Sequence, residues 1–345
     1  MKQEGGIGRN FGPLFIAFAA FLWTTDAFVR TTLEGVYTPN QLVTMEHFII
    51  VIVMIPILSK SLSKLGSFTR LEWGALLVIG IGGSAIATIA LTTAFFTGFP
   101  FQYAAVIVLL QQTQPIIAIG MAHILLKEKL PKYYYLLSIM AIFGVYLIVF
   151  PILSGFTNKV SGLSIIGTHL KDPIGLQASL LGFLAAFLWG SSTVFGRYLL
   201  EHSPTKVTYK EMTSYRFIVA FLFLLLLVFI PSRFGGEGLP AGALIPSFYV
   251  FGQLLYLALI VGLLSLVLYY FGLKSTHASI ATLFELAYPL SFFIILPFVN
   301  GDLLTNVQMA GAVCLILSTT AISYLYSSNS EQNKNATQAY PVPQK

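Results

Sequence analysis

The stretch AAVIVLLQQTQPIIAIGMAHILLKE at residues 104–128 has a counterpart in this chain, ASIATLFELAYPLSFFIILPFVNGD, at residues 278–302. Both stretches begin with two small residues and carry a proline inside an apolar run, at Pro115 and Pro289. Each ends on an acid thirteen residues after its proline. A duplicated pair of proline-broken apolar helices is typical of the binding site of a membrane carrier.

Composition places the chain in a membrane. Of its 345 residues, 56% are hydrophobic and only 9% are charged, whereas a soluble domain has about 25% charged residues. Long runs such as 133–158 and 303–330 contain no Asp, Glu, Lys or Arg, and about 20 apolar residues suffice to cross a bilayer. The first apolar run, 14–25, leads into Asp26 without a small-residue cleavage site, so we expect an uncleaved first span.

The apolar pattern predicts an all-α integral membrane protein with ten transmembrane helices. The expected spans are 13–33, 41–59, 74–96, 101–124, 133–151, 178–199, 211–231, 248–272, 278–298 and 306–326. With a cytoplasmic N-terminus, fourteen Lys and Arg residues fall in cytoplasmic segments and four in external ones. This asymmetry predicts that both termini are cytoplasmic. The net charge of +6 lies in short loops, where it sets topology rather than binding nucleic acid.

The chain contains an internal repeat. The letters AAFLW occur at 19–23 and again at 185–189, and His47 aligns with Arg216. Each copy holds five expected spans, an odd number, so the two copies should form inverted five-helix repeats around a midplane site. The expected organisation is a cytoplasmic N-terminus (1–12), a first repeat (13–151), an external linker (152–177), a second repeat (178–326) and a disordered cytoplasmic tail (327–345).

These features resemble the EamA-type transporters of the drug/metabolite transporter superfamily over most of residues 13–326. The resemblance lies in the tryptophan of each first helix (Trp23, Trp189), the basic residue early in each second helix (His47, Arg216), and each proline-bearing fourth helix followed by an acid. It implies export or import of small metabolites without ATP hydrolysis, through a central cavity lined by both halves, and the outward direction expected below rests on this resemblance. The chain departs from the family pattern at His47, where arginine is commoner.

Two polar residues precede the prolines by four positions. The carbonyls that Pro115 and Pro289 should release belong to Gln111 and Glu285. The prolines lie roughly 16 Å into their helices, close to the bilayer centre. A carboxylate at Glu285 must there be paired, face water or carry a proton. We therefore expect Gln111 and Glu285 to contact substrate; the alternative is a pair of packing kinks with a structural, hydrogen-bonded acid.

Further ionisable residues fall inside the first two spans. Asp26 and Arg30 are spaced to pair on one helical face, as an outer gate or a contact for a zwitterionic substrate, or else as a self-neutralised pair. His47 can exchange a proton near neutral pH, so we expect coupling to protons at Glu285 and His47. The alternative for His47 is a snorkelling position at the membrane interface.

Aromatic residues complete the expected site. Trp23 and Trp189 occupy equivalent mid-helix positions, and Tyr288 lies beside a helix-breaking proline. We expect their rings to line a wall of the cavity, with packing between helices as the alternative. Glu128 and Asp302 end their helices at loops, and we expect them to serve structure rather than transport.

Together these observations predict a secondary-active transporter, an exporter of small polar metabolites such as amino acids, alternating access around a midplane cavity. Expected partners are a small-molecule substrate, protons and the lipid bilayer, but no nucleic acid, in a monomer or homodimer of the bacterial inner membrane. No phosphate-binding loop or metal-ligand cluster occurs in the sequence, so no cofactor, metal or catalytic residue is expected. Alternatives are an integral-membrane enzyme or flippase acting on lipid-linked substrates, which would need acids grouped at one membrane face, and a passive channel.

Overall fold

The computed structural model describes residues 7–96, 107, 110, 111, 113–128, 130–149, 173–229, 246–300 and 306–339. These described residues form helices, short turns and one isolated β-bridge, with no β-strand among them. The helices are α1 (Ile7–Arg30), η1 (Thr31–Leu33), α2 (Pro39–Ser61), η2 (Leu62–Ser67), α3 (Arg70–Leu77), η3 (Val78–Ile86), α4 (Ala87–Phe96), α6 (Gln114–Leu125), α7 (Lys132–Val149), α9 (Pro173–Arg197), η5 (Tyr198–His202), α10 (Tyr209–Phe229), α11 (Phe248–Leu255), η7 (Tyr256–Leu264), α12 (Ser265–Ser275), α13 (Ala278–Phe284), α14 (Ala287–Asn300) and α15 (Asn306–Ala339).

Six helical stretches in the described part of the chain are long and apolar enough to cross a membrane. They are Phe11–Leu33, Pro39–Ser67, Arg70–Phe96, Pro173–His202, Tyr209–Phe229 and Phe248–Ser275. Three shorter apolar helices accompany them, Gln114–Leu125, Lys132–Leu147 and Asn306–Ile322. The chain is therefore a multi-pass membrane protein.

Local sequence signals explain where several of these helices begin. Thr38 and Gln41 form a reciprocal capping box at the start of α2, which also has Pro39 in its first turn. Thr69 and Glu72 form the same arrangement at the start of α3. These side chains satisfy backbone N–H groups that have no partner inside the helix.

Two long helices change to π geometry at corresponding places. The eight residues of α3 lead into the nine-residue π-helix η3, and the eight residues of α11 lead into the nine-residue π-helix η7. Matching element lengths at matching places indicate that the two halves of the chain share one architecture. π segments occur frequently at functional sites.

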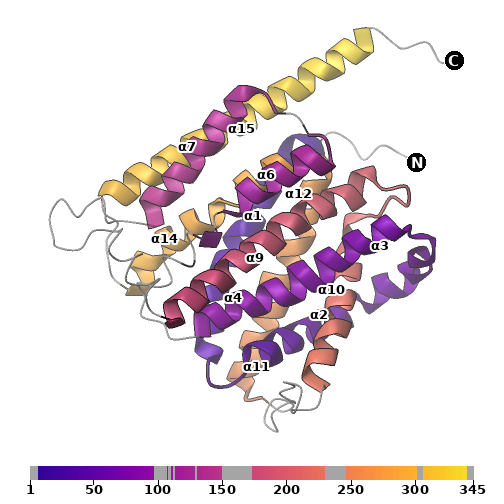
Figure 1. The fold of residues 1–345 in the computed structure, drawn as a ribbon, viewed down its shortest axis with the longest axis vertical. Helices are drawn as coiled ribbons and strands as arrows, with labels where there is room; N and C mark the ends of the chain where they lie inside the picture. The colour runs from indigo at the N-terminus through magenta and orange to yellow at the C-terminus, as the bar shows by residue number, and fades with distance from the viewer. Residues whose placement is uncertain are drawn as a thin grey trace.

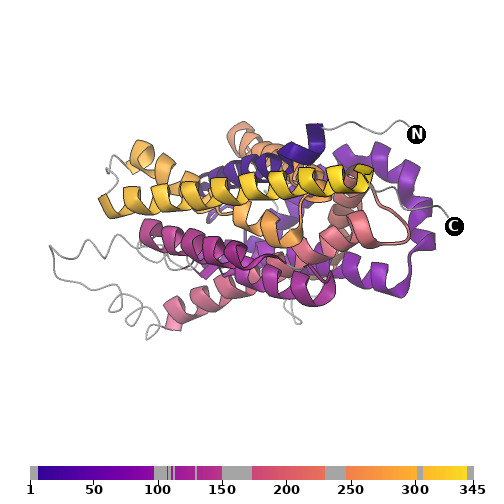
Figure 2. The ribbon, with the colours of Figure 1, turned by 90° about the horizontal axis from the view of Figure 1, so that it is seen from above.

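Contacts between the halves are reciprocal: an element of one half packs on the other half as its counterpart packs on the first. Helix α1 packs on α12 and α14, and its counterpart α9 packs on η3, α4 and α6. Further contacts join equivalent helices of the two halves, namely α2 with α10, α6 with α13, and α7 with α15. Figure 1 shows α7 and α15 side by side, and Figure 2 shows the same pairing from above.

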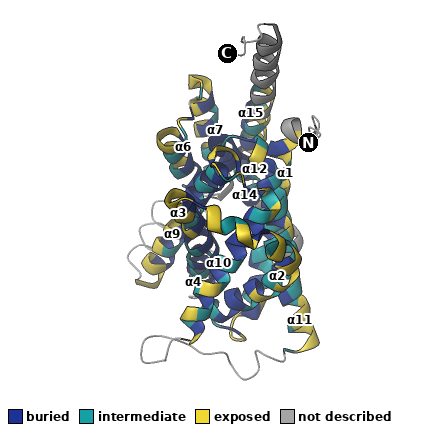
Figure 3. Cartoon of the chain, turned by 90° about the vertical axis from the view of Figure 1, so that its right-hand side faces the viewer, coloured by how far each residue is buried: buried dark blue, intermediate teal, exposed yellow. Residues whose placement is uncertain are grey.

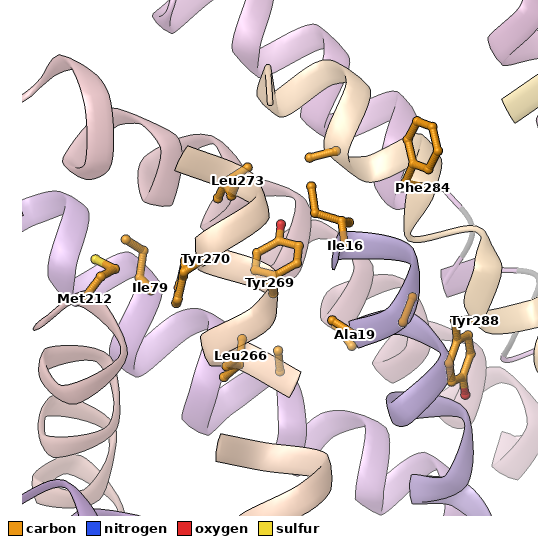
Figure 4. Packing of buried hydrophobic residues seen from close by; sticks show 14 of the residues in the cluster. Ile16, Ala19, Ile79, Met212, Leu266, Tyr269, Tyr270, Leu273, Phe284 and Tyr288 are labelled. Atoms are coloured by element: carbon orange, nitrogen blue, oxygen red, sulfur yellow. The ribbon is translucent and has the colours of Figure 1, made fainter. Parts of the chain in front are cut away.

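The buried core lies between the long helices. Figure 4 shows Ile16 and Ala19 of α1 facing Tyr269 of α12 on one side and Tyr288 of α14 on the other. Many large apolar side chains remain on the outer faces of the helices instead, where Figure 3 shows exposed positions. An outward apolar surface of this kind suits contact with lipid.

The C-terminal helix is longer than the sequence predicted. We expected a disordered tail from residue 327, but α15 continues to Ala339. No glycine or proline occurs between 312 and 340, so nothing in the sequence stops the helix where its apolar part ends. The sequence pattern located the apolar span but not the end of the helix.

Candidate functional site

A cavity of about 170 Å³ lies among helices from both halves of the chain. It has room for on the order of ten water molecules. Its walls come from α1, α2, η3, α4, α6, α9, α10, η7, α12, α13 and α14. Charged side chains on these walls therefore face a space that can hold water or a ligand rather than hydrocarbon.

The sequence-predicted residues gather around this cavity. Its lining includes Trp23, Asp26, His47, Gln111, Pro115, Trp189, Glu285 and Tyr288, whereas Pro289 is not among the lining residues. Sequence reasoning placed these residues on different helices and at different depths. The structure brings them to one space, and it adds Gln114, Thr193 and Tyr269 to the wall.

One guanidinium is shared by two carboxylates on the cavity wall. Arg30 Nε donates to Asp26 Oδ2 at 2.8 Å, and Arg30 Nη2 donates to Asp26 Oδ1 at 2.7 Å. The same Nη2 donates to Glu46 Oε2 at 3.2 Å, and Nη1 donates to Thr92 at 3.2 Å. The sequence predicted the pair of Asp26 with Arg30, but not that Glu46 of α2 joins it.

The break before Pro289 holds an acid in the cavity wall. Helix α13 ends at Phe284 and α14 begins at Ala287, so Glu285 lies between them. Its carboxylate accepts hydrogen bonds from the Tyr269 hydroxyl at 2.8 Å, from Gln114 Nε2, and from Thr193 at 3.4 Å. Three neutral donors from three helices thus surround this acid.

One sequence-based expectation, about the carbonyl of Glu285, is wrong. We expected Pro289 to leave it without a partner, but it accepts a hydrogen bond from the backbone N–H of Tyr288 at 2.9 Å. The chain tightens by one residue at the break, so a shorter-range bond replaces the helical one that proline removes. The side chain of Glu285, rather than its carbonyl, is the group available to a ligand.

The fourth helix of the first half also has a break. Helix α6 begins at Gln114 with Pro115 in its first turn, after a turn at Thr113. Thr113 closes this turn through its N–H and its hydroxyl, both bonded to the carbonyl of Leu110. Gln114 then reaches across to Glu285 in the second half. A run rich in glutamine beside the proline, QQTQ at 111–114, is the signal that could have identified Gln114.

A second arginine is fixed against the π-helix η3. Arg216 of α10 donates through Nε to Ser84 at 2.5 Å, through Nη2 to the Gly83 carbonyl at 2.9 Å, and through Nη1 to the Tyr270 hydroxyl at 2.8 Å. The indole of Trp189 donates to the same Gly83 carbonyl at 2.8 Å. The basic residue aligned with His47 is therefore held by neutral oxygens.

The aromatic residues have matching roles in the two halves. The indole N–H of Trp23 donates to the Ser265 hydroxyl at 2.7 Å, next to the π-helix η7. Its ring lies 5.4 Å from that of Tyr269. Trp23 thus contacts η7 and α12 as Trp189 contacts η3, and the two rings form separate parts of the wall.

Four buried polar atoms of lining residues have no hydrogen-bond partner within the described structure. They are Glu46 Oε1, His47 Nε2, Gln111 Oε1 and Ser192 Oγ. The other ring nitrogen of His47 lies 2.8 Å from the Val43 carbonyl. Because a carbonyl only accepts, that nitrogen carries the hydrogen, and Nε2 of the neutral ring is an acceptor. The wall therefore offers unsatisfied groups to a ligand with hydrogen-bond donors.

Glu128 joins the two halves beside the cavity. Its carboxylate accepts from the backbone N–H groups of Ala278 at 3.0 Å and Ser279 at 3.1 Å, and from the Ser279 hydroxyl at 2.7 Å. Within each copy the sequence showed two small residues and a distant acid. The structure shows that the acid of the first copy caps the helix that begins with the small pair of the second. Asp302 lies outside the described residues.

Comparison with known proteins assigns the chain to a family. The family model of the EamA-like transporters matches residues 10–150 and 176–324, so this chain belongs to the EamA-like transporter family. The Riboflavin transporter ImpX of Fusobacterium nucleatum subsp. nucleatum (strain ATCC 23726 / VPI 4351) is 28% identical over 319 residues, which cover 91% of this chain and 98% of that protein. The chain is therefore a membrane transporter with a small-molecule substrate, and these matches point away from an enzyme.

A solved crystal structure has the same fold. It superposes with a TM-score of 0.62 and 17% sequence identity, over 92% of this chain and 97% of the other. At that identity the likeness concerns the arrangement of helices alone. Among the residues that the structure describes, no three His, Cys, Asp or Glu side chains are grouped to hold a metal ion.

Proposed function

We propose that this chain is a secondary-active carrier of a flavin-like metabolite, a flat heteroaromatic ring with a hydroxylated side chain. The observation that carries the proposal is the cavity between the two halves, which combines aromatic surfaces with unsatisfied buried polar groups. Trp23, Trp189, Tyr269 and Phe217 offer faces on which a flat ring can stack. A relative that is named a riboflavin transporter supports this substrate class.

Polar recognition in this proposal comes from the break regions. Gln111, Gln114 and Glu285 supply an amide oxygen, an amide N–H and a carboxylate to the hydroxyl and imide groups of such a ligand. His47 and Asp26 add an acceptor and a second carboxylate. Small polar metabolites such as amino acids, the class expected from the sequence, are the comparison ligands in the test below.

The mechanism we propose is alternating access between two inverted five-helix repeats. The reciprocal helix contacts support a two-fold relation between the halves, and five spans in each half make that relation an inversion. The proposed organisation keeps ten crossings, repeats at 13–151 and 178–326, and both termini in the cytoplasm of a bacterial cell. The driving gradient determines the direction in which a carrier of this kind moves its substrate. Both export, the direction expected from the resemblance, and uptake should therefore be measured.

Flavin binding and flux test this function directly. The purified chain in lipid nanodiscs should quench riboflavin fluorescence on binding and gain thermal stability, because a ligand stabilises the state that binds it. Proteoliposomes should then exchange internal for external riboflavin. Stabilisation by amino acids without any response to riboflavin would replace the flavin by the class expected from the sequence.

The same measurements test the site. Replacing Gln111 by Leu or Ser192 by Ala removes a buried group that we assign to the ligand, and each change should weaken riboflavin binding by about tenfold. Ser138→Ala is the matched control, since the buried Ser138 hydroxyl already bonds to the Tyr134 carbonyl, and Ser138 is not among the cavity lining. Equal losses in Ser192→Ala and Ser138→Ala would show a general effect on packing rather than a binding site.

A further inference from the structure

We propose that Glu46 carries the proton that couples transport in this chain, through its competition with Asp26 for Arg30. The inference rests on the proposed function, because it assigns the coupling ion of the same cavity. It differs from the sequence-based expectation, which placed coupling at Glu285 and His47.

The ionisable groups around the cavity do not balance in charge. Its described lining contains the acids Asp26, Glu46 and Glu285 and the strong bases Arg30 and Arg216. With all five ionised, the walls hold one negative charge in excess. A charge inside a membrane protein is normally paired, so this set of charges favours the uptake of one positive charge. A flavin without a charge cannot supply it, whereas a proton can.

Asp26 and Glu46 share the positive charge of Arg30 unequally. Asp26 binds the edge of the Arg30 guanidinium formed by Nε and Nη2, with hydrogen bonds of 2.8 and 2.7 Å. Bidentate pairing of this kind is the strongest arrangement for an arginine and a carboxylate. Glu46 receives one longer bond of 3.2 Å from the nitrogen that also serves Asp26. Of the two acids, Glu46 is the weaker partner.

The second carboxylate oxygen of Glu46 accepts no hydrogen bond within the described structure. Oε1 lies 2.9 Å from Arg30 Nη1, but no group in the described structure donates a properly aligned hydrogen bond to it. The Glu46 side chain is only 7% exposed and that of Arg30 only 4%. Oε1 is thus a buried oxygen with a free lone pair, and a proton bound there would neutralise the excess charge.

The remaining acid has a different environment. Three donors surround Glu285, from Tyr269, Gln114 and Thr193. Such donors replace the water that a carboxylate loses on burial. Arg216, which has no carboxylate in its hydrogen bonds, provides the second positive charge in the lining.

The groups that face Glu46 come from several elements. Asp26 and Arg30 lie on α1, and Thr92 of α4 bonds to the same guanidinium. His47 is the next residue on α2, and Arg216 of α10 and Tyr288 of α14 lie on the same cavity wall. A proton on Glu46 would leave Arg30 to Asp26 alone and so weaken the tie between α1 and α2. Protonation is thereby linked to the packing of two cavity-lining helices.

Gradient-driven flavin accumulation in proteoliposomes tests this assignment. With one coupled proton, a difference of one pH unit across the membrane should change accumulation at equilibrium by about tenfold. In Glu46→Gln this stimulation should fall to about onefold, while riboflavin exchange without a pH gradient remains measurable. Glu211→Gln should keep the tenfold response. Glu211 is the control outside the cavity, where it pairs with Lys64 at 2.9 Å.

Asp26→Asn provides a second variant in case Glu46→Gln does not fold, as judged by its unfolding temperature. It leaves Arg30 to Glu46 alone, which holds Glu46 in its charged form, so the response should be lost as well. A full response in Glu46→Gln, or its loss in Glu285→Gln alone, overturns the proposal and returns coupling to the sequence-based assignment. A wild-type protein that exchanges riboflavin without any response to pH overturns it too, with the transport function intact. If riboflavin is not exchanged, the flavin assignment fails, and the same variants are compared with a substrate found by thermal stabilisation.

Discussion

Glu128 of the first half binds Ser279 of the second through two hydrogen bonds, one from the backbone N–H at 3.1 Å and one from the hydroxyl at 2.7 Å. A third bond, from the N–H of Ala278, completes the cap of α13. Glu128 is only 8% exposed. A carboxylate at a helix N-terminus is favoured by the exposed N–H groups and by the helix dipole. This contact ties α6 to the broken helix that carries Glu285.

Replacing Glu128 by Ala should therefore lower stability more than replacing its partner. Loss of the carboxylate leaves three buried donors without an acceptor, which we expect to cost about 2–4 kcal/mol. Ser279→Ala removes only the hydroxyl bond and should cost about 1 kcal/mol. Thermal unfolding of both variants in the same detergent measures the difference. Similar losses would show that the backbone bonds to Glu128 contribute little.

The two prolines offer a test of the broken helices. In the double variant Pro115→Ala and Pro289→Ala, both helices can regain backbone bonds, and the turn that presents Glu285 should become helical. We expect nearly normal membrane insertion but loss of most riboflavin flux. Insertion is measured by the amount of monodisperse protein after extraction, and flux in proteoliposomes. Full flux in the double variant would show that the breaks serve packing only.

A close approach between η3 and α9 predicts a compensating pair of substitutions. A Cβ added at Gly83 would lie 1.8 Å from Ser192 Oγ and 2.8 Å from Ser192 Cβ. Gly83→Ala should therefore destabilise the protein by about 2 kcal/mol or more. Adding Ser192→Gly removes both obstructing atoms and should recover most of that loss. Unfolding temperatures of the single and double variants decide it, since independent effects would simply add.

Topology can be tested by labelling exposed positions. On a Cys314→Ser background, Val36→Cys should react with an impermeant thiol reagent from outside the cell, and Ser67→Cys should react only after the membrane is opened. Both positions are exposed in the structure, whereas Ser203, on the same expected side as Ser67, is only 4% exposed. The opposite pattern would invert the orientation predicted from the positive charges.

The wall of the cavity could be anticipated from the sequence to a useful extent. An acid such as Asp26 or Glu285 inside an apolar span must avoid lipid, so burial or a cavity follows from its position alone. The helix breaks at Pro115 and Pro289 followed from the chemistry of proline. These expectations depend only on local sequence and on the membrane as a solvent.

Contacts between distant helices could not be anticipated in the same way. Glu46 joins Arg30, and Gln114 and Tyr269 join Glu285, only because of how α2, α6 and α12 pack. The sequence likewise contained no signal for the π-helices, because these segments are apolar or small nearly throughout and have no periodic pattern that an extra residue could shift. The length of α15 was missed because polar residues can continue a helix beyond the membrane.

The π-helices η3 and η7 contain more residues per turn than an α-helix, so each half has surplus backbone within its third helix. Each holds its backbone at five residues per hydrogen-bonded step instead of four. If that surplus moves along the helix by one turn, the residues it passes rotate by about 100° and advance by about 1.5 Å. The wall near Gly83 and the wall near Val261 can then present different side chains to the cavity without the unfolding of any span. The third helix of each half would then differ in rotation and axial position between the two ends of the transport cycle.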